Sequence, residues 1–131
     1  MSVSTSRRDQ TQLLYEAFVS GGFERLEEHL HPRVEFVNPA DAVEPGTRIG
    51  PGPFIGAVRR LHDMFDYDGF ELVDFVERGG SAVAVVRFLA RGRGSDAPVD
   101  ATFAHLLNWD DGKLARLEWF RSADEAIAAL G

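Results

Sequence analysis

The chain has 131 residues, of which 44% are hydrophobic and 27% are charged, and its formal net charge is -7. This length suits a single domain over residues 1–131 that can bury a core without covalent cross-links. The complete lack of cysteine excludes disulfides and cysteine metal sites and is compatible with the cytoplasm, while the acidic charge argues against nucleic-acid partners and anionic membranes.

A first helix is predicted over residues 7–20. Ser6 is followed three residues later by Asp9, a pattern typical of a helix start. Apolar residues then recur at helical spacing, so one side of this helix is expected to face a core. The glycines at positions 21 and 22 end it.

Residues 23–30 predict a second, shorter helix, which ends at His31-Pro32 because the residue before a proline disfavours helical geometry. Alternation over residues 34–38 predicts a strand. Residues 39–53 are rich in proline and glycine and predict a loop that leads into a third helix. We expect the buried stripe of that helix to be formed by Phe54, Val58, Leu61 and Phe65.

The second half of the chain carries strand signals separated by short turns. We predict strands over residues 70–78, 81–93, 99–109 and 113–121, joined as a meander. The longest apolar run, residues 82–86, is too short to span a bilayer, so no membrane partner is expected. Ser122 and Glu125 form a capping box that opens a final short helix.

The order of these elements indicates the fold class. Helices in the first part and strands in the second indicate an α+β domain, with the helices on one face of an antiparallel sheet. Because the strands are long, we expect the sheet to curl strongly into a cone wrapped on the N-terminal helices. The hollow of this cone is the natural place for a ligand pocket.

Several segments, taken in order, resemble SnoaL-like domains of the nuclear transport factor 2-like superfamily, which also holds ketosteroid isomerases and limonene epoxide hydrolases. These segments are residues 14–18, 21–24, 30–32, 34–39, 48–50, 111–113 and 126–131. The resemblance covers nearly the whole chain and implies a cystatin-like roll around a pocket for a small, largely apolar molecule. It also implies a homodimer through the outer sheet face and acid/base isomerase, polyketide-cyclase-like or hydrolase activity.

The ketosteroid isomerase pattern asks for a tyrosine on the first helix and for two carboxylic acids in the cavity. Those positions fall on Leu14, Asn38 and, counted from the Asp111-Gly112 turn, Ala104. A neutral amide cannot abstract a proton, so the residues argue against ketosteroid isomerase chemistry. No metal-ligand spacing and no nucleotide fingerprint occurs, and we therefore expect neither a metal nor a cofactor.

Two residues are predicted as catalytic candidates. Asn38 ends an apolar strand face, so its amide either orients a ligand or bonds the turn that follows. His105 lies on the more apolar side of its strand, where it is either a general acid/base inside the cone or a hydrogen-bonded residue on the outer sheet face. Counting along the strand from the Asp111-Gly112 turn places Ala104 inside the cone and His105 on the outer sheet face, whereas the apolar character of its neighbours places His105 inside.

Ligand-binding candidates come from all parts of the chain. We expect aromatic walls and orienting groups from Tyr15, Phe18, Phe36, Phe54 and Trp119. Arg121 binds an anionic ligand group at the pocket mouth or pairs with Asp124, and Arg87 is a pocket cation or half of a salt bridge.

Acidic side chains also occur in the predicted loop. Asp41 and Glu44 either serve from a lid over the pocket or are simply solvated.

Three functions are compatible with this sequence. The first is a small-molecule enzyme with an ionisable group inside the cone. The second is a non-catalytic protein that binds a small apolar ligand between aromatic walls. The third is a dimeric interaction module, which predicts a filled cone and an exposed apolar patch on the outer sheet face.

Overall fold

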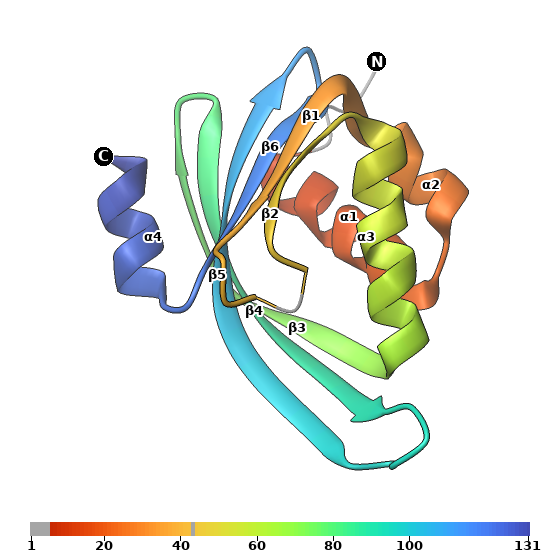
Figure 1. Ribbon diagram of the computed structural model, residues 1–131. Coiled ribbons are helices and arrows are strands. Elements are labelled where there is room, and N and C mark those ends of the chain that lie inside the picture. Colours follow the sequence, from red (N-terminus) through yellow and green to blue (C-terminus); the bar gives the residue numbers. More distant parts are fainter. Residues whose placement is uncertain (1–5, 43) are drawn as a thin grey trace.

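Three helices pack on the concave face of one curled six-stranded sheet, and a fourth helix lies on the opposite face (Figure 1). This arrangement comes from a computed structural model that describes residues 6–42 and 44–131. The elements, in chain order, are α1 (Arg7–Ser20), α2 (Phe23–Glu28), β1 (Leu30–Asn38), β2 (Gly46–Ile49), α3 (Pro51–Met64), β3 (Phe65–Arg78), β4 (Ser81–Gly92), β5 (Pro98–Asp110), β6 (Lys113–Phe120) and α4 (Ala123–Leu130). The α+β cone predicted from the sequence is confirmed.

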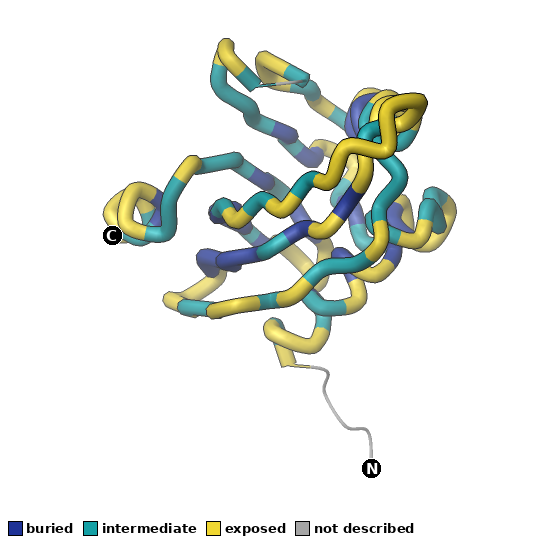
Figure 2. Tube along the Cα trace, turned by 90° about the horizontal axis from the view of Figure 1, so that it is seen from below, coloured by how far each residue is buried: buried dark blue, intermediate teal, exposed yellow. Residues whose placement is uncertain are grey.

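The strands follow the order β2-β1-β6-β5-β4-β3, so β3 to β6 form the predicted antiparallel meander. The sheet is not wholly antiparallel, because β1 runs parallel to its neighbour β6. At the edge of the sheet, β2 is antiparallel to β1. Figure 2, seen from below, shows buried residues along the inner strands of the sheet. The curl leaves the concave side of the sheet facing α1 and α3, where the site lies.

The helix ends predicted from capping patterns are confirmed. Ser6 caps α1 by accepting a hydrogen bond from the Asp9 backbone N–H at 3.1 Å. Gly21 ends the helix with φ 75°, a left-handed conformation that glycine adopts without steric cost. Ser122 caps α4 in the same way by accepting from the Glu125 N–H at 3.2 Å.

Three predicted boundaries are wrong because strand pairing extends further than the local sequence signals. Leu30 belongs to β1 and not to the second helix, since it pairs with Leu114 of β6. The predicted loop contains β2, whose residues pair with the end of β1. Phe65 begins β3, opposite Gly92, and is therefore not part of the buried stripe of α3.

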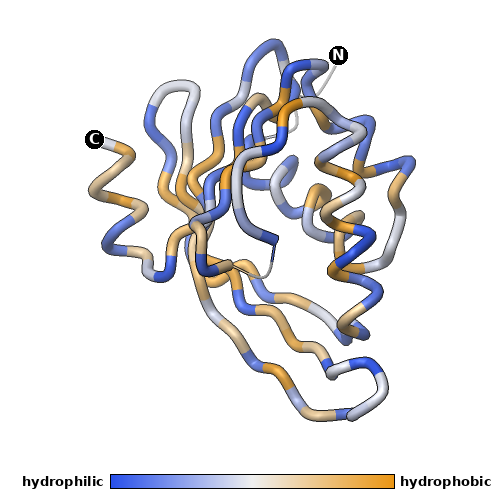
Figure 3. Tube along the Cα trace, in the orientation of Figure 1, coloured by the Kyte–Doolittle hydropathy of each residue, from blue (hydrophilic) through white to orange (hydrophobic). Residues whose placement is uncertain are grey.

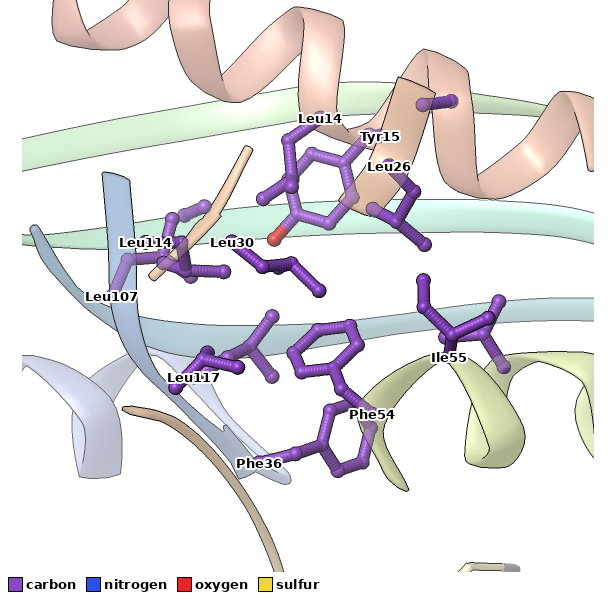
Figure 4. Packing of buried hydrophobic residues seen from close by; sticks show 14 of the residues in the cluster. Leu14, Tyr15, Leu26, Leu30, Phe36, Phe54, Ile55, Leu107, Leu114 and Leu117 are labelled. Carbon is purple, nitrogen blue, oxygen red and sulfur yellow. The ribbon is translucent and has the colours of Figure 1, made fainter. Parts of the chain in front are cut away.

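The core has two parts, one on each side of the sheet. The larger cluster lies between α1, α2, α3 and the concave face, and Figure 4 shows Tyr15 among its apolar side chains. A smaller cluster joins Ala126 of α4 to Val83, Val85, Ala104 and Leu106 on the convex face. The tail helix thus covers the apolar part of the face through which the sequence predicts a dimer.

Beyond α4 the convex face carries charged pairs, together with the exposed side chain of Leu89. The bidentate pair of Arg87 with Asp100 and the pair of Arg91 with Asp68 lie on exposed side chains along β3, β4 and β5. The turn between β4 and β5 is hydrophilic, as Figure 3 shows at the lower end of the sheet. None of the helices in the described residues is long and apolar enough to cross a membrane.

Candidate ligand cavity

A partly enclosed cavity of about 360 Å³ lies between the concave face of the sheet and the helices α1 and α3. This volume falls in the range of sites that hold small organic molecules. Aromatic and aliphatic side chains form most of its wall. The loop that joins β1 to β2 contributes Asp41, Ala42 and Glu44 to the wall.

Seven of the nine predicted site residues line this cavity together. They are Tyr15, Phe18, Phe36, Asn38, Phe54, His105 and Trp119. They come from α1, β1, α3, β5 and β6, so the curled sheet brings together residues that are up to 104 positions apart, from position 15 to position 119. Phe36 and Phe54 meet edge to face with their ring centroids 4.6 Å apart, which fixes the contact between β1 and α3.

The structure places the two predicted arginines outside the cavity. Arg87 points to the convex face and donates two hydrogen bonds to Asp100, at 2.8 and 2.7 Å. Arg87 interrupts the apolar residues Val83, Val85 and Leu89 on one strand face, which left it as a pocket cation or as half of a salt bridge, and the structure gives the salt bridge. The apolarity of Val83 and Val85 serves contact with α4.

Arg121 follows the end of β6 and is exposed. Its guanidinium is ion-paired with Asp41 of the β1–β2 loop and lies 5.8 Å from the Trp119 ring centroid. The predicted alternative partner, Asp124, is not the one that the structure gives. This contact ties the loop at the cavity mouth to the end of β6.

His105 occupies the cavity side of β5, and Ala104 lies under α4. The turn register, which assigned Ala104 to the cavity, is therefore wrong. A bulge lies beside the turn on β6, where Asn108 pairs with Arg116 but Trp109 pairs with Leu114. It exchanges the faces of β6 relative to the turn and leaves the alternation along β5 unchanged, so apolarity was the better guide to the side on which His105 lies.

Tyr15 and His105 form the most buried polar contact of the cavity. The Tyr15 hydroxyl lies 2.6 Å from Nδ1 of His105, and the two rings stack with centroids 5.7 Å apart. Tyr15 is 3% exposed and His105 is 9% exposed. We refer to these two residues as the Tyr15–His105 pair.

Burial keeps both members of the Tyr15–His105 pair uncharged. Desolvation lowers the pKa of His105 from 6.5 to about 3, because the imidazolium loses its hydration without gaining an anionic partner. The same cause raises the pKa of Tyr15 well above its usual range. At neutral pH the pair can donate or accept hydrogen bonds, but it carries no charge.

Asn38 and Glu44 hold the loop at the cavity mouth. The Asn38 side-chain amide donates to the Glu44 backbone carbonyl at 2.8 Å, so it bonds the following loop as well as lining the cavity. The Glu44 carboxylate is 11% exposed and is ion-paired with both Arg48 and Arg60. The predicted alternative in which Glu44 is simply solvated is therefore wrong.

Four further aromatic residues of the wall were not predicted. They are Phe65, Tyr67, Phe88 and Phe103. Phe103 lies two positions before His105 on the same face of β5, so the strand period contained the signal for it. Phe88 follows Arg87 on β4 and therefore lies on the opposite face, which is the cavity side. Tyr67 lies before the predicted start of its strand, and burial raises the pKa of its hydroxyl to about 12.

The described residues contain no group of three or more histidine or acidic side chains that could hold a metal ion. The four histidines of the chain are therefore not part of such a cluster in this part of the molecule.

A model of the SnoaL-like domain matches residues 11–117 of the chain. The chain belongs to the SnoaL-like domain family. The match extends from α1 into β6 and so includes every residue that lines the cavity except Trp119. Among curated proteins, none matches this SnoaL-like chain in sequence.

Solved structures share the nuclear transport factor 2-like fold of this SnoaL-like domain at low sequence identity. An NTF2-like protein from Burkholderia thailandensis is similar with a TM-score of 0.76 and 21% identity, covering 98% of this chain and 99% of that one. A protein with a ketosteroid isomerase-like fold from Catenulispora acidiphila, in complex with trimethylamine, has a TM-score of 0.77 and 14% identity, covering 94% and 92%. TerC, co-crystallized with polyporic acid, has a TM-score of 0.72 and 21% identity, covering 94% and 95%.

Proposed function

We propose that this SnoaL-like protein binds a small, largely apolar molecule in the cavity. The observation that carries the proposal is the combination of a volume of about 360 Å³ with a wall of aromatic and aliphatic side chains around one buried polar pair. Apolar walls with a few placed polar groups are characteristic of small-molecule sites. The structures of TerC with polyporic acid and of the Catenulispora acidiphila protein with trimethylamine support this use of the fold.

The dimeric interaction module is less well supported than ligand binding. It required a filled cone and an exposed apolar patch on the outer sheet face. The cone instead contains the cavity, and α4 packs on the apolar part of the convex face. A homodimer remains our proposal for the assembly, with α4 and the charged pairs beside it as the contact surface. We also propose that the protein is cytoplasmic, because a chain without cysteine is compatible with a reducing compartment.

Acid/base chemistry is the second candidate function, with His105 and Asn38 as the proposed residues. It is favoured by the position of His105, whose ring lines the cavity and is hydrogen-bonded to Tyr15 behind it. The lowered pKa of His105 makes it a weak proton acceptor at neutral pH. Hydrogen bonding to a ligand thus fits the pair better than proton abstraction does, and we rank isomerase-like or cyclase-like activity after binding.

Ligand titration of the uniformly ¹⁵N-labelled protein tests the binding proposal. Naphthalene derivatives are suitable probes because they are flat, apolar and small. We expect shifts of backbone amide signals from the strands and helices that line the cavity. The variant Ala101→Trp places a large side chain at the cavity wall and should abolish these shifts, whereas Leu89→Trp, on an exposed position of the same sheet, should retain them.

Two results would contradict the binding proposal. The first is an absence of shifts in the unmodified protein up to the solubility limit of the probes. The second is unchanged binding by a folded Ala101→Trp variant, since the probe would then be bound elsewhere. For the catalytic candidate, loss of turnover in His105→Ala with retained binding is the expected result once a reaction is assayed, and full turnover would remove His105 from the chemistry.

A further inference from the structure

The second ring nitrogen of His105 faces the cavity without a protein partner. Nδ1 is engaged by Tyr15, and the structure gives Nε2 no hydrogen bond to any residue in the described ranges. Nε2 is also not among the fully buried side-chain atoms that lack a partner in those ranges, where only Nε1 of Trp109 occurs. Because His105 lines the cavity, Nε2 is accessible from it.

Tyr15 determines which ring nitrogen carries the proton. If the Tyr15 hydroxyl donates to Nδ1, the proton of the neutral imidazole is on Nε2, and the only donor of the pair without a protein partner is the Nε2–H that is accessible from the cavity. In the reverse arrangement Nδ1–H donates to the hydroxyl oxygen, and the hydroxyl hydrogen needs another acceptor. Nothing in the described part of the chain supplies that acceptor within hydrogen-bonding distance. The cavity wall therefore presents a single N–H donor at this point.

No arginine or lysine side chain is part of the cavity wall in residues 6–42 and 44–131. The two ionisable acids of the wall are Asp41 and Glu44, and each is ion-paired with arginine. An anionic group that reached His105 would lose its hydration among apolar side chains and would meet no free cation. Such a loss is costly, whereas an uncharged acceptor loses much less and is compensated by one hydrogen bond.

We infer that the ligand of this cavity carries an uncharged hydrogen-bond acceptor, such as a ketone, quinone or ester carbonyl, which Nε2–H of His105 binds, and that Tyr15 is the positioning residue that fixes this tautomer. The inference rests on the proposed function, because it names the substrate class of the same cavity. It assigns selectivity to the Tyr15–His105 pair and excludes carboxylates of equal shape.

Three probes of nearly equal shape test the charge and acceptor requirement. They are 2-acetylnaphthalene, with a neutral carbonyl, 2-isopropenylnaphthalene, in which a methylene group replaces the carbonyl oxygen, and 2-naphthoate, which is anionic at neutral pH. The dissociation constants are measured by titration at constant pH. We expect the ketone to bind about fivefold more tightly than the alkene, which corresponds to one net hydrogen bond. We expect the carboxylate to bind more than about tenfold more weakly than the ketone.

Tyr15→Phe and His105→Leu separate the two roles. His105→Leu removes the donor, so the ketone and the alkene should bind equally. Tyr15→Phe keeps the imidazole but removes the hydroxyl that fixes which ring nitrogen is protonated. The ¹⁵N signals of histidine-labelled protein should change from one Nε2-protonated form in the unmodified protein to a mixture in the variant. A structural role of Tyr15 alone would lower stability without this spectroscopic change.

The outcomes distinguish this inference from the proposed function. If none of the three probes binds the unmodified protein, the proposed function fails and the inference fails with it. If all three bind equally, or if the carboxylate binds most tightly, the binding function stands and the inference is overturned. A His105 ring protonated on Nδ1 in the unmodified protein also overturns it. These readouts need only the unmodified protein, so a variant that does not fold leaves the test intact.

Discussion

The carboxylate of Glu44, in the β1–β2 loop, is ion-paired with the guanidinium of Arg60 on α3. The guanidinium of Arg48, on β2, is ion-paired with the same carboxylate at 3.5 Å. Since the Glu44 side chain is 11% exposed and lines the cavity, this loop is fastened to the helix layer as well as to the sheet. The mouth of the cavity is thereby given a defined shape.

Replacement of Glu44 by Gln should loosen this loop. The substitution keeps the size of the side chain but leaves two arginines without their shared anion. We expect the free energy of unfolding to fall by about 1 kcal/mol, less than for a fully buried pair because Arg60 is half-exposed. Urea denaturation measures the change, and Glu77→Gln, at an exposed position of β3, is the matched control. Equal stability of the two variants would show that the ion pair does not fasten the loop.

The buried imidazole of His105 should make the protein less stable in mild acid. Its pKa is about 3 in the folded protein and 6.5 in the unfolded chain, so the unfolded chain binds one more proton between these values. Stability from this residue is therefore complete above the unfolded pKa and decreases as the pH falls from about 6.5 towards 3. Between pH 7 and pH 5 the expected loss is about 2 kcal/mol.

The variant His105→Gln isolates this pH effect. Glutamine does not titrate, so the difference in unfolding free energy between the variant and the unmodified protein should shrink by the same amount on going from pH 7 to pH 5. Urea denaturation at both pH values provides the measurement. A difference that is independent of pH would mean that His105 is protonated normally in the folded state.

The parts of the fold that sequence reasoning predicted well are those set by local patterns. The caps at Ser6 and Ser122 and the turns of the meander depend on neighbouring residues, and their elements begin within a few positions of the prediction. Strand β2 could not be found in this way, because it is four residues long and exists through its pairing with β1. The start of β3 at Phe65 likewise depends on its partner Gly92 in a distant part of the chain.

Which side of a strand faces the cavity was harder to predict than the strand itself. Apolarity selected the correct side of β5, where His105 lies, but the convex side of β4, where Arg87 lies. Both faces of β4 are apolar over part of their length, because one contacts the inner core and the other contacts α4. A local pattern cannot distinguish two buried faces, and the choice requires knowing where the last helix packs.

Arg87 offers a test of this assignment of faces. Its side chain is exposed and bonded to Asp100 on the convex side, so Arg87→Ala should leave the affinity for a cavity ligand unchanged within about twofold. The comparison uses the same naphthalene probes and titration as above. Phe88→Ala, one position later and on the cavity wall, should in contrast weaken binding clearly. A strong loss of affinity in Arg87→Ala would place this residue on the other side of the sheet.

Helix α4 should be held to the convex face mainly by the apolar contact around Ala126. This residue is fully buried against strands β4 and β5, so Ala126→Asp would bury a carboxylate without a partner. We expect α4 to leave the sheet, at a cost of about 1–3 kcal/mol in unfolding free energy. Hydrogen exchange of the α4 amides measures the release. Ala128→Asp, at an exposed position of the same helix, should leave the exchange of the α4 amides unchanged, and unchanged exchange in Ala126→Asp would show that α4 is held by other contacts.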